Sequence, residues 1–328
     1  MSQSSPSAPV EVRGLTKQYG ELKAVDNVDL TVEAGDVFGY LGPNGAGKTT
    51  SMRMMLGLIS PSAGSVRLFG KDPQSSIEAL EGVAGFVEAP RFYPYLDGRT
   101  NLKLLASLDG NGAPSRVDEV LEVVELAERG GDKVGGYSHG MRQRLGIAAS
   151  LLRQPRLLML DEPATGLDPA GMRDMRRLVR RLADDGITVL LSSHLLAEVD
   201  ELCNRVAIVR KGQIAYEGRL EDLRKAAGLS YSLRTTNDAS ARIILKAARG
   251  IEADDDAADG SLRFHPDNID AVAALSQALH EAGAHVTELA PRSATLEELF
   301  FDMTEGEGAA ADDAARLERA ARITEGNA

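Results

Sequence analysis

The sequence Gly42-Pro43-Asn44-Gly45-Ala46-Gly47-Lys48-Thr49-Thr50 decides the fold of this chain. It fits the pattern G-x-x-x-x-G-K-[ST] of a phosphate-binding P-loop. The apolar residues 37–41 before it predict a buried strand, and a helix is predicted after it by Met52, Met54, Met55, Leu56 and Leu58. A glycine-rich turn that merely precedes Lys-Thr would not need a strand and a helix on its two sides. We therefore interpret all nine residues as a nucleotide-binding loop.

The residue types of this loop indicate its chemistry. Glycines let successive backbone N–H groups turn inward around phosphate oxygens, and the N-terminus of the following helix adds its positive end. Lys48 would neutralise the β- and γ-phosphates of ATP, and the Thr49 hydroxyl would ligate Mg²⁺. The loop thus predicts ATP and Mg²⁺ as cofactors.

The composition limits the classes of protein to consider. A chain of 328 residues can form two domains with separate cores. The net charge is −12, with −10 in residues 231–328 and −2 in residues 1–230, which argues against nucleic acid as the main partner. No stretch approaches the roughly 18–20 apolar residues that span a bilayer. Residues 1–9 are polar and do not predict secretion. The single Cys203 excludes a disulfide framework, suits a reducing cytoplasm and is expected to be buried.

The segment before the P-loop predicts an antiparallel edge. Residues 1–8 are expected to be a disordered leader. The alternation in residues 10–13 predicts a strand, and residues 16–20 predict a turn. Tyr19 is a candidate to stack on the purine of ATP, and the alternative is a half-buried surface aromatic.

The segment after the P-loop helix predicts two strands and then helices. The strands are expected at residues 66–69 and 83–87, the second ending at Glu88. Residues 90–96, Pro-Arg-Phe-Tyr-Pro-Tyr-Leu, form an aromatic–proline cluster in a chain with only 4% aromatic residues. Helices are predicted at residues 102–108 and 117–126. The cluster could be an exposed partner site or could pack within the helical region.

The sequence Gly135-Gly136-Tyr137-Ser138-His139-Gly140-Met141 opens a helix rich in Ala and Leu. Ser138 is placed as an N-cap, which leaves neighbouring backbone N–H groups free to bind a ligand. An ordinary capped helix would look the same in isolation. The residues that follow change this interpretation.

Two acidic residues end the next predicted strand, residues 156–160. Asp161 suits a water linked to Mg²⁺, and Glu162 suits a base that orients and polarises the attacking water. The two acids could instead merely terminate the strand. A tight loop at residues 165–169 contains Asp168 and precedes a basic helix. His194, directly after the core strand predicted at residues 187–191, is a candidate sensor of the γ-phosphate, whereas a lone histidine is more often structural.

In this order the motifs resemble the nucleotide-binding subunit of ABC transporters over about residues 9–220. In the resemblance Tyr19 is the A-loop aromatic, Glu88 holds the Q-loop position, and His194 is the switch histidine. The signature is residues 137–141, Walker B is residues 157–161 with Glu162, and the D-loop is residues 165–168. The resemblance implies an α/β P-loop NTPase fold: a RecA-like core with an antiparallel β edge and an inserted helical subdomain near residues 89–150. It also implies an ATP sandwich, in which the Ser138, His139 and Gly140 region of one copy, with Asp168 nearby, closes on the nucleotide of the other.

The signature and the Q-loop position depart from the family pattern. The usual signature is Leu-Ser-Gly-Gly-Gln, whereas this chain has Tyr137-Ser138-His139-Gly140-Met141. Glu88 replaces the usual glutamine and keeps an oxygen ligand for Mg²⁺ while adding a negative charge. Both departures are similar to those in antibiotic and drug exporters, including daunorubicin- and bacitracin-type ATPases.

A new pattern of strands and helices begins after the nucleotide-binding domain, which we place at residues 9–221. Strands are predicted at residues 231–234, 262–265 and 286–289, and helices near residues 239–248 and 269–282. With residues 295–300, Thr-Leu-Glu-Glu-Leu-Phe, residues 222–304 resemble the small α/β C-terminal domain of those export ATPases. A separate regulatory module is the alternative. Residues 305–328 are an acidic, Ala-rich tail.

The resemblance implies an ATPase that powers a separate membrane permease, with export of an antibiotic, drug or lipid-like compound. It also implies an ATP-dependent homodimer, peripheral on the cytoplasmic face of the cell membrane. One alternative is a soluble ABC ATPase that acts on ribosomes or DNA. Such proteins usually carry two cassettes or a long coiled-coil insertion, and this sequence shows neither. A second alternative, an importer subunit, is disfavoured by analogy alone.

Overall fold

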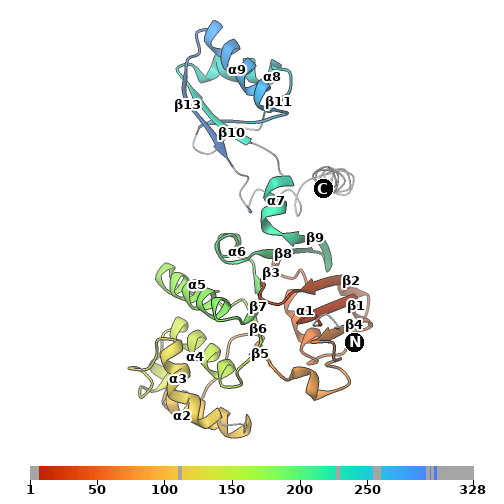
Figure 1. Cartoon of the computed structure of the whole chain (residues 1–328), viewed down its shortest axis with the longest axis vertical. Coiled ribbons are helices and arrows are strands. Elements are labelled where there is room, and N and C mark those ends of the chain that lie inside the picture. Colours follow the sequence, from red (N-terminus) through yellow and green to blue (C-terminus); the bar gives the residue numbers. More distant parts are fainter. Residues whose placement is uncertain are drawn as a thin grey trace, which may run out of the picture. The chain divides into compact units, whose positions relative to one another are not determined.

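We describe the protein from a computed structural model, which defines residues 7–109, 113–226, 230–253, 260–292, 296, 299 and 300. The chain divides into two compact units, Met1–Leu220 and Glu221–Ala328, and each is described by itself (Figure 1). Most of the predicted leader, the whole predicted tail and part of residues 295–300 lie outside the described residues.

A three-stranded antiparallel sheet opens the first unit, in the order β2-β1-β4. Its strands are β1 (Val10–Tyr19), β2 (Leu22–Val32) and β4 (Ala63–Leu68). The antiparallel edge predicted at residues 10–13 is confirmed. The turn predicted at residues 16–20 is wrong, because Lys17 pairs with Val25 and Tyr19 with Leu22. The chain reverses only at Gly20, whose φ of 59° lies in the left-handed region.

A six-stranded sheet, in the order β5-β6-β7-β3-β8-β9, forms the centre of the first unit. The strands are β5 (Val83–Phe86), β6 (Leu157–Asp161), β7 (Thr188–Ser193), β3 (Val37–Leu41), β8 (Arg205–Arg210) and β9 (Gln213–Arg219). Only the β8–β9 pair is antiparallel. Every residue of β3, β6 and β7 is buried, as expected for central parallel strands. Their carboxyl ends therefore meet at one edge of the sheet.

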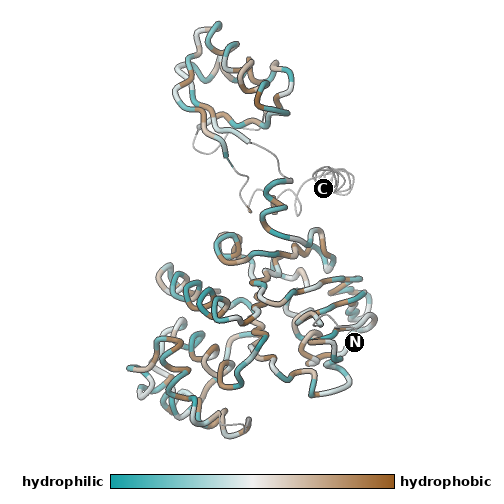
Figure 2. Tube along the Cα trace, viewed as in Figure 1, coloured by the Kyte–Doolittle hydropathy of each residue, from teal (hydrophilic) through white to brown (hydrophobic). Residues whose placement is uncertain are grey.

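Helices α1 (Lys48–Met55), α5 (Pro169–Asp184) and α6 (Leu196–Leu202) pack against strands of this sheet. Helix α7 (Leu220–Ala226) comes directly after β9 in the sequence. Helix α1 is shorter than predicted, because Gly57 adopts a left-handed φ of 70° and leaves Leu58 exposed. Figure 2 shows α5 as a mostly hydrophilic helix with hydrophobic positions at intervals. Its buried residues are Met175, Leu178, Val179 and Leu182.

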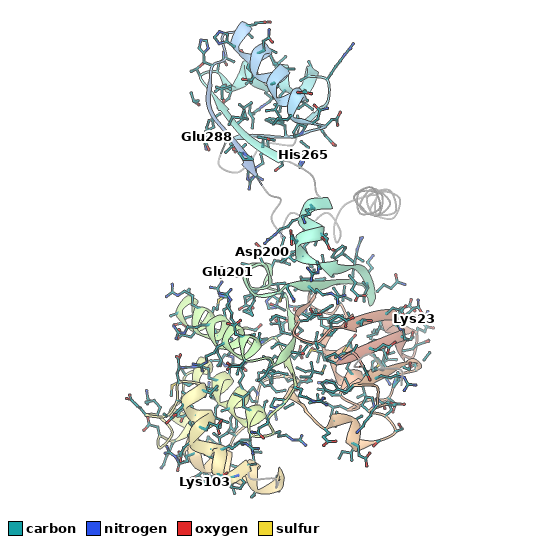
Figure 3. All side chains as sticks on the ribbon, in the orientation of Figure 1. Lys23, Lys103, Asp200, Glu201, His265 and Glu288 are labelled. Carbon is teal, nitrogen blue, oxygen red and sulfur yellow. The ribbon has the colours of Figure 1, made fainter. Side chains whose placement is uncertain are left out.

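Three helices, α2 (Gly98–Asp109), α3 (Val117–Val123) and α4 (His139–Leu151), cluster beside the β5 end of the six-stranded sheet (Figure 1). Helix α3 ends earlier than predicted, because Glu125 has a left-handed φ of 56°. Short 3₁₀ helices lie at Ile77–Leu80, Ala113–Arg116 and Val134–Gly136. Polar side chains such as Lys23 of β2 and Lys103 of α2 extend from the outside of the unit (Figure 3).

The second unit contains a four-stranded antiparallel sheet in the order β11-β12-β10-β13. Its elements are β10 (Ser230–Thr235), α8 (Asp238–Ala247), β11 (Ile251–Ala253), β12 (Leu262–Pro266), α9 (Ile269–Glu281) and β13 (Val286–Arg292). Leu233, Phe264 and Leu279 are fully buried in its core. The predicted strands and helices are confirmed, whereas the three-residue β11 was not predicted.

Two further sequence predictions concern the single cysteine and membrane-spanning segments. Cys203 is buried as expected, and burial raises the pKa of its thiol. Among the helices that the structure describes, none has both the length and the apolarity needed to cross a bilayer.

Candidate functional site

The P-loop connects β3 to α1 and is held by close backbone contacts. Gly47, the residue before α1, has a φ of 101°, and a Cβ on it would lie 2.3 Å from the carbonyl oxygen of Ala24. Only glycine fits this position. The Tyr40 hydroxyl lies 3.1 Å from Ser51 Oγ, and burial raises the pKa of Tyr40 to about 12. This contact joins the strand before the loop to the helix after it.

Lys48 points into the loop rather than into solvent. Its side chain is only 6% exposed, and its Nζ donates to the carbonyl oxygens of Gly42 at 2.8 Å and Pro43 at 3.3 Å. The same Nζ lies 3.2 Å from Glu162 Oε1. The lysine predicted to bind phosphate therefore carries its positive charge at the carboxyl edge of the sheet.

Thr49 and Asp161 meet at this edge although 112 residues separate them. The Thr49 hydroxyl donates to Asp161 Oδ2 at 2.9 Å, and Ser192 Oγ donates to the other carboxylate oxygen. Asp161 is 5% exposed, so these bonds orient a buried carboxylate. The pair presents hydroxyl and carboxylate oxygens, the ligands that Mg²⁺ prefers.

Two protein ligands are compatible with Mg²⁺, because this ion usually keeps waters and binds substrate phosphates. The described residues contain no group of three or more His, Cys, Asp or Glu side chains that could hold a metal. Thr49 and Asp161 would therefore hold the ion together with nucleotide oxygens. Bound there, Mg²⁺ would neutralise phosphate charge.

Glu162 lies at the centre of a network of polar contacts. Its Oε2 accepts from Thr165 Oγ1 at 2.7 Å and contacts His194 Nδ1 at 2.6 Å, while Oε1 faces Lys48. Burial acts to raise the pKa of Glu162, but the Thr165 hydrogen bond, the Lys48 charge and the His194 contact outweigh burial, so the pKa is lowered. The residue has a left-handed φ of 51°. Backbone strain of this kind at a charged residue suggests a functional role.

Glu88, predicted as a Mg²⁺ ligand, is placed differently. Its exposed carboxylate forms an ion pair with Arg53 of α1. Among the described residues, the structure gives it no hydrogen bond to Thr49 or Asp161. Its backbone is also left-handed, with a φ of 71°. The structure therefore brings Thr49 and Asp161 together, whereas Glu88 is paired with Arg53 instead.

Tyr19 and the aromatic–proline cluster both present exposed rings. Tyr19 ends β1 with 52% of its surface exposed, and Lys17 Nζ lies 5.2 Å from the ring centroid. In the cluster Tyr93 and Tyr95 are 55% and 65% exposed, with ring centroids 5.8 Å apart. Both sites are therefore accessible to a planar or apolar partner.

The signature residues lie at the N-terminus of α4. Ser138 is the N-cap, as predicted, and its Oγ accepts from the backbone N of Met141 at 3.2 Å. Because the first turn of a helix has unpaired N–H groups, His139 and Gly140 can offer theirs to an anion. The D-loop residue Asp168 caps α5 in the same way, accepting from Gly171 N at 2.8 Å.

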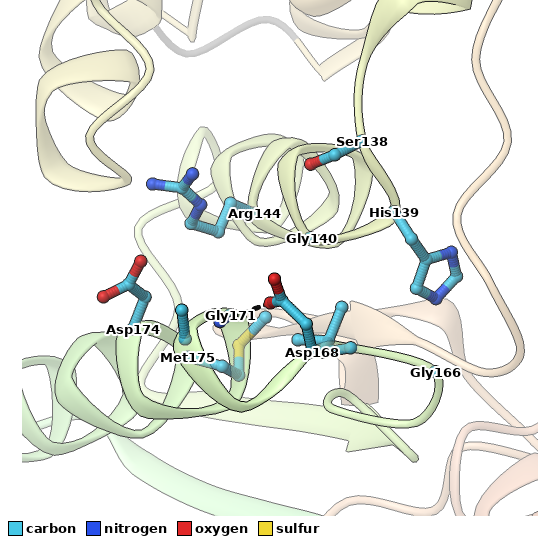
Figure 4. A pocket seen from close by; sticks show the side chains of 11 residues that line it. Ser138, His139, Gly140, Arg144, Gly166, Asp168, Gly171, Asp174 and Met175 are labelled. Atoms are coloured by element: carbon cyan, nitrogen blue, oxygen red, sulfur yellow. Dashed lines mark hydrogen bonds between the residues drawn. The ribbon is translucent and has the colours of Figure 1, made fainter.

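These two helix starts face each other across a pocket of about 360 Å³ (Figure 4). Its lining includes Ser138, His139 and Gly140 from the signature, Gly166, Leu167 and Asp168 from the D-loop, and Arg144, Ala170, Gly171, Asp174 and Met175 from α4 and α5. No P-loop residue lines it. Within one chain the signature and the P-loop therefore form separate sites.

Sequence reasoning missed two contributors, Ser192 and Thr165. Ser192 holds Asp161 and also accepts from the backbone N of Glu162 at 3.0 Å. The sequence places Thr165 in the D-loop and gives no sign that its hydroxyl binds Glu162, as it does in the structure. The sequence signal for Ser192 is its position at the end of a core strand beside the Walker B strand.

Comparison with known proteins agrees with this geometry. The sequence profile of the ABC transporter family matches residues 25–165. The bacitracin transport ATP-binding protein BcrA of Bacillus licheniformis is 36% identical over 302 residues, which cover 92% of this chain and 98% of BcrA. The chain belongs to the ABC transporter family. The predicted resemblance to the ATP-binding subunits of antibiotic exporters is confirmed.

Two further relatives extend the comparison. The daunorubicin/doxorubicin resistance ATP-binding protein DrrA of Streptomyces peucetius is 35% identical, with 97% of this chain and 98% of DrrA covered. A solved ATP-binding cassette of an ABC transporter in its ADP conformation superposes with a TM-score of 0.61 at 26% identity, covering 66% of this chain and 92% of that one. The predicted P-loop NTPase fold is confirmed, and this ABC protein is an ATPase.

Proposed function

We propose that this ABC ATPase drives a separate membrane permease that exports an antibiotic, drug or lipid-like compound. The observation that carries the catalytic part is the network in which Glu162 contacts Lys48, Thr165 and His194. The names of BcrA and DrrA, a bacitracin transporter subunit and a daunorubicin/doxorubicin resistance protein, support export over import and over action on ribosomes or DNA.

The residues have separable roles in hydrolysis. The lowered pKa keeps Glu162 ionised at neutral pH, so it can orient the attacking water and accept its proton. Lys48 balances the negative charge of the β- and γ-phosphates, and His194, held by Glu162, contacts the γ-phosphate. Thr49 and Asp161 hold Mg²⁺, and Tyr19 stacks on the purine.

We place each ATP between two copies of the chain. One copy supplies the P-loop, and the other supplies Ser138, Gly140 and the neighbouring backbone N–H groups. This arrangement accounts for the signature pocket, which contains no P-loop residue of its own chain. The homodimer forms with ATP, because the phosphates bridge the two faces, and it loosens when the γ-phosphate is released.

The permease contact is assigned to the aromatic–proline cluster. Tyr93 and Tyr95 are exposed, and the Tyr93 backbone N donates to Asn101 of α2, a helix whose Leu104, Leu105 and Leu108 are also exposed. Exposed apolar patches of this kind mark partner sites. The subunit is thereby held peripherally on the cytoplasmic face of the membrane.

The direct test is transport into inverted membrane vesicles that contain this subunit and its co-expressed permease. Doxorubicin and bacitracin are the first cargoes to test. Export requires ATP-dependent accumulation that stops with Glu162→Gln and persists with the surface variant Glu128→Gln. Accumulation that is independent of ATP, or ATP-dependent retention of ribosomes or DNA instead of a membrane protein, would refute the proposal.

A further inference from the structure

His139 departs from the glycine of the usual signature, and its side chain has a specific contact. The imidazole Nε2 lies 3.1 Å from the carbonyl oxygen of Thr165, which follows β6 and Glu162. A carbonyl oxygen only accepts, so Nε2 carries the proton and donates. Figure 4 shows the His139 ring extending from α4 toward the loop that contains Gly166.

The surroundings hold the ring in this orientation. A Cβ on Gly166 would lie 3.7 Å from both His139 Cδ2 and Nε2, so the imidazole packs on the backbone of that loop. Gln143, one turn further along α4 and 3% exposed, has its amide nitrogen 3.5 Å from the same ring nitrogen; because that ring nitrogen is a donor, this is a packing contact and not a hydrogen bond. The side chain is therefore packed from two elements, α4 and the D-loop.

Thr165 connects this contact to the catalytic carboxylate. Its hydroxyl donates to Glu162 Oε2 at 2.7 Å, and its backbone N donates to the Glu162 carbonyl oxygen at 3.2 Å. A hydrogen bond that fixes the Thr165 peptide also restricts where the Thr165 hydroxyl can point. His139 thus reaches Glu162 through one intervening residue.

We propose that His139 is a positioning residue for ATP hydrolysis: by holding the Thr165 carbonyl, it aligns Thr165 and, through it, the Glu162 carboxylate of the same chain. This proposal rests on the role assigned to Glu162 above. The His139 side chain is then engaged with its own D-loop, and only its backbone N–H remains for a nucleotide. Its loss should lower kcat rather than weaken ATP binding.

The test compares His139→Ala, His139→Gln and Thr165→Ala in the full-length protein. His139→Ala should lower kcat by about three- to tenfold, as expected for one hydrogen bond, and leave KM for ATP within about twofold. His139→Gln keeps an N–H donor at the same number of bonds from Cβ and should recover most of kcat. His280→Ala, which removes an imidazole from α9, is the matched control.

The double variant His139→Ala/Thr165→Ala gives the decisive comparison. If His139 acts through Thr165, the double variant should be no slower than Thr165→Ala alone. Multiplied effects, an unchanged kcat in His139→Ala, a failure of His139→Gln to recover activity, or a rise mainly in KM would each overturn the proposal. Thermal unfolding confirms that each variant is folded.

The Glu162→Gln variant separates the two hypotheses. If it retains normal turnover, the catalytic role of Glu162 fails. If it is inactive while His139→Ala is unaffected, only the positioning role of His139 fails.

Discussion

The replacement of Glu162 by glutamine tests the catalytic network most directly. The amide has the shape of the carboxylate but no charge and only one acceptor oxygen. In the structure Oε1 faces Lys48 at 3.2 Å, while Oε2 accepts from Thr165 at 2.7 Å. If the amide oxygen faces Thr165, its NH₂ group faces the Lys48 ammonium. In the reverse orientation the NH₂ group faces the Thr165 hydroxyl, which must then accept instead of donate. Both orientations lose the carboxylate charge to which Lys48 and Thr165 bind.

These losses give separate magnitudes for stability and for turnover. Loss of a hydrogen bond to a charged group costs about 1.5–3 kcal/mol, so the variant should remain folded but less stable. Removing a general base lowers turnover roughly 10²- to 10⁴-fold, equivalent to about 3–5 kcal/mol in the activation free energy. The effect on turnover should therefore exceed the effect on stability.

Three measurements on the purified protein check this expectation. Phosphate release at saturating ATP and Mg²⁺ gives kcat, titration with a fluorescent ATP analogue gives affinity, and light scattering after gel filtration with ATP gives the oligomeric state. We expect low kcat, retained binding and a trapped dimer. Glu128→Gln makes the same chemical change at an exposed position of the chain. Turnover within tenfold of the wild type, or a monomer with bound ATP, would refute the assignment of Glu162.

Four other predictions follow from particular contacts. Gly98→Ala places a Cβ 2.5 Å from the Tyr137 hydroxyl oxygen and should lower the free energy of unfolding by about 1–3 kcal/mol, with recovery by Tyr137→Leu in chemical denaturation. Thr49→Ala should raise the Mg²⁺ concentration for half-maximal phosphate release by roughly tenfold or more, because it removes a ligand; an unchanged Mg²⁺ dependence would exclude Thr49. Burial raises the pKa of Glu198, so its ionisation opposes folding as pH rises. Glu198→Gln should therefore increase thermal stability at pH 7 and have little effect below pH 4.5, the ordinary glutamate value, where Glu198 is protonated in both folded and unfolded chains. Phe92→Ser/Tyr93→Ser should spare ATP binding but reduce recovery of the permease in pull-downs, and full recovery would remove the cluster from the interface.

Some features of the first unit could be predicted because their signals are local. The buried run at residues 37–41 and the N-cap Ser138 depend on neighbouring residues alone, and both are confirmed. The extent of β1 could not be predicted in this way. Residues such as Thr16 and Gly20 favour a turn locally, yet pairing with β2 extends the strand to Tyr19.

The site shows the same division between local and long-range information. Motif spacing identified Thr49, Asp161 and Glu162 individually, and parallel strands explain why they share one edge. The sequence could not give the partners of their side chains. Glu162 is fixed by Thr165 and His194, and Glu88 pairs with Arg53 across two separate elements. Such pairings depend on loop backbone geometry, including the left-handed φ of both glutamates.

Hydrogen bonds in the structure explain how this chain accommodates two departures from the usual signature, Tyr137 and His139. Tyr137 replaces the usual leucine of the signature, and its buried hydroxyl donates to the Arg129 carbonyl oxygen at 2.7 Å. Burial raises the pKa of Tyr137, which keeps this hydroxyl protonated as a donor. His139 replaces a glycine and binds the Thr165 carbonyl. Since a buried donor without a partner destabilises a fold, the Tyr137 hydroxyl requires the acceptor that this chain supplies. The signature of this chain is consequently hydrogen-bonded to the helical region through Tyr137 and to the D-loop, next to Glu162, through His139.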